Sequence, residues 1–531
     1  MTITRRNLLA LSVSAAILGL AGCASPGLGS GPSISGVVAI GGPLANATVT
    51  VVDARGVKKT AVADAKGAYA INAEGLSAPL LISAIEAGSN TNCRYNATLR
   101  ARCLSSVLTS LGAGSNVANI NPITDRIVSD VAVQLKFIGP QQLVDSGKTA
   151  GITPEAVAAA KKTSMAGFGA ALKAAGVDDV EKFDAVSTPM AANRQGVDAV
   201  LEVVNHNRNY DNPTSESAYT VLTDISFRPI VGLNGSGPYE PLDFARAQRE
   251  LAAIKSAKVR VLVVGDSTAA TYELQRLPRM GWGQVFENEF KVDAGVKVLN
   301  AARAGRSSKD FYMGAWYQQM ARFMQPGDLV LINHGHNDQN CDSTKKDRGP
   351  ADVAGLCSYP NDVNGKSQFP VGKPEMSFQK SLERYIELAR AAGAMPVMLT
   401  PTTRVWNKDR KPGFPVVPQH MTSQNATQGF AFIGDYSRTV KDTATANSVP
   451  LIDLEAKTIA FANAHEKDWK DYWLAVGDFK TWPWYATQSA GTFDKPDTTH
   501  FQQKGAEAVA GMVAQGIKET PALKAWAALL K

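Results

Sequence analysis

The pattern of apolar and polar residues changes twice along the chain. Between Ile34 and Leu81 apolar and polar residues alternate, and Gly-Gly, Ala-Arg-Gly and Ala-Lys-Gly turns interrupt the alternation. Such alternation between turn residues is typical of half-buried β-strands. From about Val107 to Ala192 the chain is rich in alanine, and its apolar residues recur at helical spacing. We therefore expect a small β-module followed by a mainly helical region.

Prolines mark two expected helix starts in that helical region. Asn121-Pro122 and Thr153-Pro154 combine a residue that caps a helix with a proline at the first helical position. Residues 193–240 are polar and interrupted by Asn, Pro and Gly, which indicates an irregular connector with a strand or two. His206 stands alone in this connector, so we expect it to have a structural or surface role.

A third pattern begins at Ala257. Short runs rich in Val, Leu and Ile alternate with amphipathic helical segments from here on. Such an order predicts a parallel α/β sheet covered by helices on both faces. Ligands of these sheets bind outside the carboxyl ends of the strands, so the residues that follow each run matter most. The runs are KVRVLVV (258–264), VKVLN (296–300), DLVLIN (328–333), MPVMLT (395–400) and VPLIDL (449–454).

Polar residues able to do chemistry follow these runs. Ser267 comes after the first run, and we expect it exposed on a tight turn with its amide near a helix N-terminus. Gly305 lies in the loop after the second run and Asn337 after the third. Asp497 and His500 stand on one short turn just before a predicted helix. Parallel strands would gather all of them at one edge of the sheet.

These residue types suit ester hydrolysis. A serine hydroxyl needs a base to take its proton, and His500 can serve while Asp497 fixes its tautomer. The attacked carbonyl becomes an oxyanion, which needs hydrogen-bond donors aimed at it. The N–H groups of Ser267 and Gly305 and the side-chain amide of Asn337 are the candidate donors. The pattern therefore predicts a serine hydrolase.

The motifs resemble those of a known family. GDST, the glycine of ARAGRSS, the asparagine of GHND, and DTTH resemble the four blocks of SGNH, or GDSL-like, hydrolases. The GWG at 281–283, the N-x-A-x-A-G-R-S at 300–307 and the GAE at 505–507 resemble the rhamnogalacturonan acetylesterase branch. This resemblance covers about residues 259–513. It implies a flavodoxin-like three-layer sheet, no cofactor, Ser267 as nucleophile, His500 as base, Asp497 as its partner, and the three oxyanion donors named above.

Two enlargements depart from the family pattern. The first, residues 339–376, holds Cys341 and Cys357. The second, residues 468–488, holds Trp469, Trp473, Trp482 and Trp484, which either stack on sugar rings or pack the Asp497 loop onto the core. The candidate substrate contacts are Trp282, Arg306, Arg404, Trp482 and Trp484.

Several polar residues near the motifs have more than one reading. Arg306 and Arg404 either meet a substrate carboxylate or pair with local acids. We expect Asp266 and Asp338 to hold turns, and His334 and His336 to be structural, with no metal site.

The first residues are typical of an export signal. Arg5 and Arg6 precede an apolar run from Leu8 to Leu20, which is shorter than the roughly 20 residues that span a bilayer. The run ends in Leu-Ala-Gly-Cys at residues 20–23, which resembles a bacterial lipobox with Cys23 as the lipidated residue. The Arg pair also partly matches a twin-arginine signal. A plain signal peptide with a chance cysteine is the alternative, and both place the mature chain outside the cytoplasm.

The other four cysteines form two sequence-local pairs. An oxidising compartment favours disulfides between Cys93 and Cys103 and between Cys341 and Cys357. The chain is 44% apolar and 19% charged, as in soluble globular proteins. Its net charge of +7 is spread thinly, so we expect no nucleic-acid partner.

These observations divide the chain into five parts and predict one function. The β-module resembles the small β-sandwich of carboxypeptidase regulatory-like modules. We expect an esterase, exported and lipid-anchored in the bacterial cell envelope, that removes acetyl groups from plant cell-wall polysaccharide, with pectic rhamnogalacturonan as the first candidate. An SGNH lipase or thioesterase for other acyl esters and a glycan-binding surface lipoprotein are the alternatives, and the oligomeric state is open. The expected parts are a signal peptide (1–23), a tether (24–33), the β-module (34–86), a mainly helical and irregular region (87–245) and the hydrolase domain (246–531).

Overall fold

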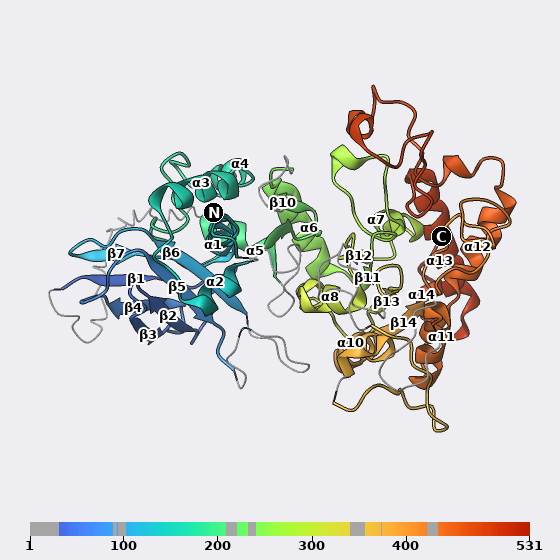
Figure 1. Cartoon of the computed structure of the whole chain (residues 1–531), viewed down its shortest axis with the longest axis horizontal. Coiled ribbons are helices and arrows are strands. Elements are labelled where there is room, and N and C mark those ends of the chain that lie inside the picture. Colours follow the sequence, from blue (N-terminus) through green and yellow to red (C-terminus); the bar gives the residue numbers. More distant parts are fainter. Residues whose placement is uncertain are drawn as a thin grey trace, which may run out of the picture.

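The structure is a computed structural model of the whole chain. It describes residues 31–88, 93, 102–137, 139–208, 220–231, 240–339, 356–372, 374–421 and 434–531. The expected signal peptide with Cys23 and most of the tether therefore lie outside the described residues. Within the described ranges, no helix is both long enough and apolar enough to cross a membrane. Figure 1 shows the strands of the N-terminal part at one end of the molecule and the α/β domain at the other.

Seven described strands form two sheets in the N-terminal part. They are β1 (Ser33–Val37), β2 (Thr48–Val52), β3 (Lys58–Val62), β4 (Ala68–Asn72), β5 (Leu80–Ile85), β6 (Cys103–Leu108) and β7 (Ser115–Val117). One sheet has the order β4-β1-β7 and the other the order β3-β2-β5-β6. Residues of both sheets, among them Ile34, Val49 and Ile82, share one apolar core.

Strands β6 and β7 lie beyond residue 86, where the sequence predicted the end of the β-module. Strand β6 is buried at Cys103, Leu104, Ser105, Ser106 and Val107 in succession. A strand that is covered on both faces does not alternate between apolar and polar residues. This burial explains why the period-two pattern failed to reveal β6.

One of the two expected disulfides is confirmed. Cys93 and Cys103 are bonded across a sequence separation of 10 residues. Cys341 lies outside the described residues, so its pairing with Cys357 stays a prediction.

Helices and a small antiparallel sheet follow the N-terminal strands. The elements are α1 (Pro122–Gln134), α2 (Pro140–Ser146), α3 (Pro154–Met165), α4 (Gly169–Ala174), α5 (Val197–Glu202), β8 (Val204–Asn207), β9 (Val221–Asp224) and β10 (Pro229–Val231). Asn121 and Thr153 cap α1 and α3, which confirms both expected helix starts. The connector holds three strands in the order β10-β9-β8.

A buried carboxylate ties α1 to this small sheet. Asp125 of α1 accepts hydrogen bonds from Thr220 Oγ1 at 2.7 Å and from Ser105 Oγ at 2.6 Å, and it lies 2.8 Å from His206 Nε2. Burial by itself raises the pKa of Asp125, but the neighbouring Arg208 and His206 outweigh it and hold that pKa below its usual range. His206 therefore contributes to packing, as the sequence suggested.

The C-terminal domain is built on a five-stranded parallel sheet. Its strands are β11 (Val259–Gly265), β12 (Val296–Asn300), β13 (Leu329–Asn333), β14 (Met395–Leu399) and β15 (Leu451–Ile452). They pair in parallel in the order β12-β11-β13-β14-β15. This is the 2-1-3-4-5 order of flavodoxin-like doubly wound sheets, as the sequence predicted.

Successive residues of β11 point to opposite layers of helices. Leu262 and Val264 belong to one apolar core, whereas Val261 and Val263 belong to the other. The first core includes α6 (Phe244–Ser256), α8 (Ser308–Met313), α9 (Trp316–Ala321), α10 (Phe378–Ala391) and α11 (Tyr436–Ala446). The second includes α7 (Trp282–Val285), α12 (Leu454–Ala464), α13 (Gln503–Glu519) and α14 (Lys524–Ala527). The domain therefore has three layers.

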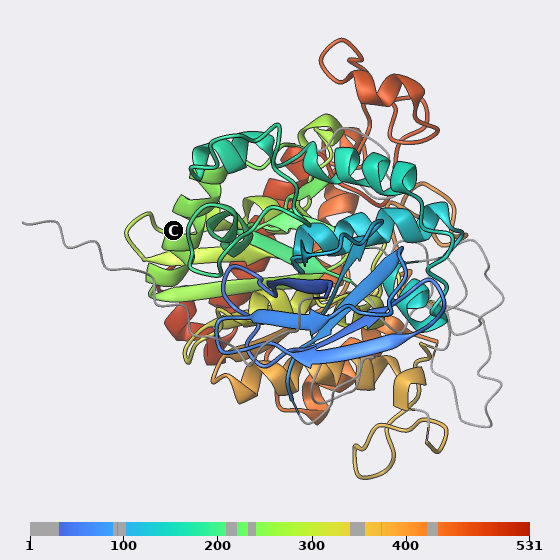
Figure 2. The same ribbon diagram turned by 90° about the vertical axis from the view of Figure 1, so that its left-hand side faces the viewer.

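The middle region is packed firmly against this domain. The first apolar core runs without interruption from α1 through α6 to α11. Gln319 Nε2 of α9 donates to the carbonyl oxygen of His206 at 2.8 Å, and Arg322 Nη2 donates to Asn205 Oδ1 at 3.0 Å. Figure 2, in which the N-terminal strands face the viewer, shows the helices of the middle region lying across the sheets.

Replacing the α1 cap should destabilise the chain. The Asn121 side chain is fully buried and accepts hydrogen bonds from the N–H groups of Ile123 and Thr124 at 2.9 and 3.1 Å. Asn121→Ala leaves both N–H groups unsatisfied, so we expect a loss of about 1–2 kcal/mol and a lower melting temperature. Asn121→Ser, which keeps a capping oxygen, should lose less. Calorimetric melting of both variants tests this, and equal melting temperatures would contradict the capping role.

Candidate active site

The candidate residues meet at the carboxyl edge of the parallel sheet. Ser267 follows β11, Gly305 follows β12 and Asn337 follows β13. Asp497 and His500 lie on the turn that precedes α13. The backbone of Leu474 holds this turn, because its N–H donates to the His500 carbonyl and its carbonyl accepts from the Asp497 N–H, both at 2.8 Å.

Ser267, His500 and Asp497 form a continuous hydrogen-bonded chain. His500 Nε2 lies 2.8 Å from Ser267 Oγ, and His500 Nδ1 lies 2.7 Å from Asp497 Oδ2. The other carboxylate oxygen of Asp497 accepts from the N–H groups of Thr499 and His500 at 2.9 and 3.1 Å. The carboxylate is therefore oriented by its own turn, and it orients the imidazole in turn.

The charges around His500 favour its neutral form. Burial and then the cation of Arg279 lower the pKa of His500 below its usual range, and Arg404 adds to this shift, while Asp497 opposes it. Burial raises the pKa of Asp497, but its hydrogen bond and charge interaction with His500, the Thr499 N–H and the Arg279 cation together outweigh that effect and keep its pKa low. A neutral imidazole beside an ionised carboxylate is the state in which histidine can accept a proton.

The surroundings of Ser267 differ from the expectation in two respects. The residue is on a turn, as predicted, but it is only 7% exposed and no helix begins beside it. Asp266 Oδ1 accepts from the N–H and the Oγ1 of Thr268 at 3.0 and 2.8 Å. Such local side-chain bonds compete with helix formation, so the chain turns again before the next helical residues, Leu274–Arg276.

Two backbone N–H groups at the site have no acceptor among the described residues. They belong to Ser267 and to Gly305, whose φ of +76° is readily adopted only without a Cβ. The third expected donor, Asn337 Nδ2, donates to the carbonyl oxygen of Arg306 at 3.2 Å, which orients its amide. The loops after β11, β12 and β13 thus carry the three candidate donors, and the oxyanion hole that they would form stays a prediction.

Asp266 and Asp338 hold turns, as expected. Besides its bonds to Thr268, Asp266 accepts from the His336 N–H at 3.3 Å. Asp338 accepts from the N–H and the Oγ of Ser308 at 2.7 and 2.6 Å. Burial raises the pKa of Asp338 to about 7.

Sequence reasoning missed four residues of the surroundings. His420 contacts the His336 ring with centroids 4.7 Å apart, and its Nδ1 lies 2.6 Å from Glu455. Arg279 comes from the loop before α7, and its guanidinium lies over the Tyr272 ring at 4.5 Å. No motif marks these positions, because tertiary packing alone brings them to the site.

Two of the five candidate substrate contacts are wrong. Trp282 is fully buried and its Nε1 donates to Asn333 Oδ1 at 3.1 Å, so it belongs to the core. A Cβ on its neighbour Gly283 would lie 2.7 Å from the carbonyl oxygen of Ala269, so the GWG motif permits close packing of α7. Arg306 is buried and pairs with Asp310 at 2.8 Å, which is the local-acid alternative.

The other three candidates remain accessible. Arg404 is partly exposed, lies over the Trp406 ring at 5.9 Å, and approaches Gln339 Oε1 at 3.5 Å. Trp482 and Trp484 are partly exposed on a segment that projects from the body of the molecule (Figures 1 and 2). Trp473 by contrast is buried, as the packing alternative expects, whereas stacking of Trp482 and Trp484 on sugar rings stays a prediction.

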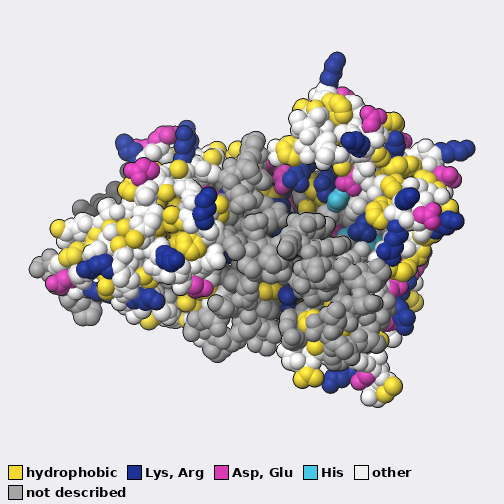
Figure 3. All heavy atoms as spheres, viewed as in Figure 1, with side chains coloured by type: hydrophobic (Ala, Val, Ile, Leu, Met, Phe, Trp, Pro, Cys, Tyr) yellow, Lys and Arg dark blue, Asp and Glu magenta, His cyan; other side chains and the backbone are white. Residues whose placement is uncertain are grey.

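The described residues show neither a concentrated positive surface nor a metal-binding cluster. Figure 3 shows Lys and Arg side chains dispersed among acidic ones on the described part of this face, where they form no single basic patch. Within the described ranges, no three His, Cys, Asp or Glu side chains come together as a metal-binding group.

Comparisons with known proteins agree with the site. The family described as GDSL-like Lipase/Acylhydrolase matches residues 263–508. Rhamnogalacturonan acetylesterase RhgT of Bacillus subtilis (strain 168) is 30% identical over 264 residues, which are 49% of this chain and 90% of that protein. The probable rhamnogalacturonan acetylesterase YesY of the same bacterium is 28% identical over 259 residues, 49% of this chain and 92% of that protein.

A solved structure is also similar. The protein YXIM_BACsu of Bacillus subtilis has 16% identity and a TM-score of 0.33, and the match covers 56% of this chain and 64% of that chain. Because the chain covers 90% of a relative to which it is 30% identical, it belongs to the GDSL-like lipase/acylhydrolase family of carboxylic ester hydrolases.

Proposed function

We propose that the chain is a serine acetylesterase that removes acetyl groups from a plant cell-wall polysaccharide, with pectic rhamnogalacturonan as the first candidate. The observation that carries this proposal is the hydrogen-bonded chain from Ser267 Oγ through His500 to Asp497. The names of the two relatives support the acetyl group and the pectic substrate.

Acylation of the serine is the first step. His500 Nε2 takes the proton of Ser267 Oγ as this oxygen attacks the ester carbonyl. The oxyanion accepts hydrogen bonds from the N–H groups of Ser267 and Gly305 and from the Asn337 amide. When the carbonyl re-forms, the sugar oxygen leaves with the proton from His500, and the acetyl group stays on Ser267.

Water completes the cycle. His500 takes a proton from a water molecule whose oxygen attacks the acetyl-serine carbonyl, and the same donors hold the second oxyanion. The Ser267 oxygen leaves with the proton that His500 returns, and acetate is released. Asp497 keeps its charge throughout and stabilises the imidazolium that forms in each step.

The features around the site suit a polymeric substrate. Trp482 and Trp484 are partly exposed, and the Arg276 guanidinium lies over the Trp484 ring at 5.7 Å. Exposed aromatic faces can stack on sugar rings, and the Arg276 and Arg404 cations suit acidic sugars.

We propose that the mature chain is exported and lipid-anchored in the bacterial cell envelope through Cys23. The lipobox-like residues 20–23 support the anchor, and the disulfide Cys93–Cys103 suits an oxidising compartment. Residues 34–86, together with the later strands β6 and β7, would then form a carboxypeptidase regulatory-like spacer between the anchor and the enzyme.

Removing the serine hydroxyl should abolish hydrolysis. For Ser267→Ala we expect kcat for p-nitrophenyl acetate to fall at least about 10⁴-fold, because the attacking group is lost. The melting temperature should stay near that of the unaltered chain. Retained activity in a folded variant would refute the assignment.

The acyl group and the polymer can be tested with the same pair of proteins. We expect p-nitrophenyl acetate to be cleaved faster than longer acyl esters, and acetate to be released from acetylated rhamnogalacturonan. Acetylated xylan and homogalacturonan are the comparison polymers, and Ser267→Ala is the blank. Preference for long acyl chains would instead favour a lipase or thioesterase.

The positive charge of Arg279 should set the acidic limb of the pH profile. Because this cation lowers the pKa of His500, Arg279→Gln should raise that pKa and move the acidic limb of kcat/KM to higher pH. Arg276→Gln, from the same loop, should move the limb less, because Arg276 lies over Trp484. Identical limbs in the two variants would show that Arg279 does not act on His500.

A further inference from the structure

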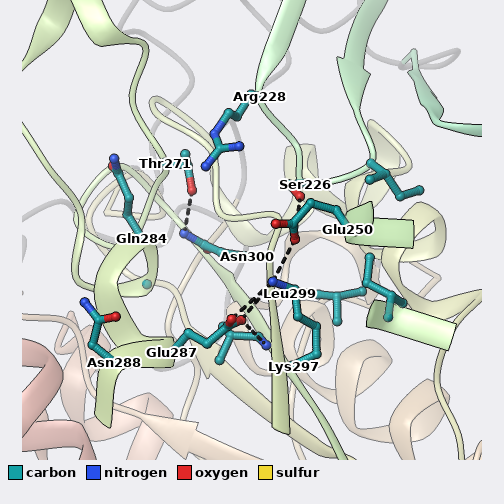
Figure 4. A pocket seen from close by; sticks show the side chains of 14 residues that line it. Ser226, Arg228, Glu250, Thr271, Gln284, Glu287, Asn288, Lys297, Leu299 and Asn300 are labelled. Atoms are coloured by element: carbon teal, nitrogen blue, oxygen red, sulfur yellow. Dashed lines mark hydrogen bonds and ion pairs between the residues drawn. The ribbon is translucent and has the colours of Figure 1, made fainter. Parts of the chain in front are cut away.

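A cavity that is not lined by Ser267, Asp497 or His500 lies where the middle region meets the parallel sheet. It has a volume of about 250 Å³ and is lined by the β9–β10 turn, α6, α7 and β12 (Figure 4). Cavities that hold drug-sized ligands measure about 300–1,000 Å³, so this one suits a smaller molecule the size of a single sugar. The β9–β10 turn and the whole of α6 precede the part of the chain that the family model matches.

One cation in the cavity is poorly matched by acidic partners. Arg228 Nη1 is buried without a hydrogen-bond partner in the described part of the chain. Its nearest paired carboxylate oxygen, Asp224 Oδ2, is 4.0 Å away and is shared with Arg246 Nη2 at 3.4 Å. The other cation, Lys297, forms ion pairs with Glu250 at 2.7 Å and with Glu287 at 3.1 Å. The Arg228 side chain as a whole is 38% exposed, so the part of its guanidinium that is not buried is the group that a carboxylate would meet.

The remaining walls offer hydrogen bonds to hydroxyl groups. Figure 4 shows Arg228 and Thr271 on one side of the cavity and the Gln284 and Asn288 amides on another. Asn288 is exposed, and its side chain has no hydrogen-bond partner among the residues that the structure describes. None of the fourteen described residues that line the cavity is aromatic, so a sugar ring would be held by polar contacts and by the aliphatic residues Ile225, Ile254, Val298 and Leu299.

The same wall supports the loop that carries Ser267. Gln284 Oε1 accepts from the Tyr272 N–H at 3.0 Å, and Asn300 Nδ2 donates to the Ala269 carbonyl oxygen at 2.8 Å. The Tyr272 hydroxyl in turn donates to the Ser267 carbonyl oxygen at 2.8 Å. A ligand that binds Gln284 therefore contacts a residue two hydrogen bonds away from the backbone of the nucleophile.

We propose that this cavity is a second binding site, for a small hydroxylated carboxylate of the uronic-acid class, and that its occupancy changes the rate at the Ser267 loop. The carboxylate pairs with Arg228, and the ring hydroxyls bond to Gln284 and Asn288. The proposed binding of this ligand does not depend on the proposed function. The proposed effect on rate rests on the proposed function, because it requires ester hydrolysis at Ser267.

Calorimetric titration of the full mature chain tests the binding half. We expect galacturonate to bind with one-to-one stoichiometry, and Arg228→Gln to weaken binding at least about tenfold by removing the charge-assisted hydrogen bonds. Arg246→Gln is the matched control, because Arg246 also pairs with Asp224 but does not line the cavity. It should bind within about twofold of the unaltered chain. Asn288→Ala, at an exposed residue that the fold does not need, should weaken binding about threefold or more.

Two probes separate the parts of the ligand. Galactose has similar hydroxyls without the carboxylate, and acetate has the carboxylate without the ring, so both should bind at least about tenfold more weakly. No binding of galacturonate, or equal binding by Arg228→Gln, would overturn the site. Equal binding of galactose or of acetate would overturn the ligand class.

Initial rates with p-nitrophenyl acetate test the second half. Saturating galacturonate should change the rate at least about twofold in the unaltered chain and in Arg246→Gln, but not in Arg228→Gln. An unchanged rate with intact binding would overturn the coupling. A change that persists in Arg228→Gln would assign the effect to the catalytic cleft and overturn it as well. If no ester is hydrolysed at all, the proposed function fails, and the titration still decides whether the site exists.

Discussion

The parallel pairing of β11 with both of its neighbours decides where the chemistry of this protein can occur. Val263 pairs with Asn300 of β12, and Gly265 pairs with Asn333 of β13. The chain therefore leaves all three strands at one edge, where the loops that follow carry Ser267, Gly305 and Asn337. A slip of one residue would turn each side chain to the opposite face of the sheet. The apolar cores on both faces prevent such a slip.

Burial beneath this edge gives the site its electrostatic character. Asp266, Asp338, His336 and His420 lie almost without solvent under the reacting groups. Burial raises the pKa of the two carboxyl groups and lowers the pKa of the two histidines, so all four are displaced toward their neutral forms. The charges that remain near His500 belong to Asp497, which opposes its pKa shift, and to Arg279 and Arg404, which favour it. The imidazole is thus balanced between a carboxylate and two cations.

The middle region is part of the same folded body as the sheet. Its helix α1 belongs to the apolar core that also holds α6, α8 and α10 of the α/β domain, and β8 is hydrogen-bonded to α9. The two Bacillus relatives match only 49% of this chain. Residues 220–231 and α6 form part of a wall beside β12. The cavity lined by Arg228 exists because this wall and the sheet meet.

The sequence by itself determined the parallel sheet, its helical cover, and the reacting groups. Runs such as VKVLN coincide with β12, and the spacing of Asp497 and His500 brings them together on one turn whatever the rest of the chain does. Asn121 and Thr153 predicted the starts of their helices correctly, because a helix cap bonds only to residues next to it in the sequence.

Tertiary structure decided the features that depend on distant neighbours. The sequence made Trp282 a candidate substrate contact, but in the fold its Nε1 donates to Asn333 in the core. Arg306, another candidate, is buried and forms an ion pair with Asp310. Strand β6 was concealed because α1 covers its second face. Arg279 and His420 lie in the surroundings of His500, but no sequence motif predicted that they would. In each case the outcome depends on contacts between residues that are far apart in the chain. A local sequence pattern does not reveal such contacts.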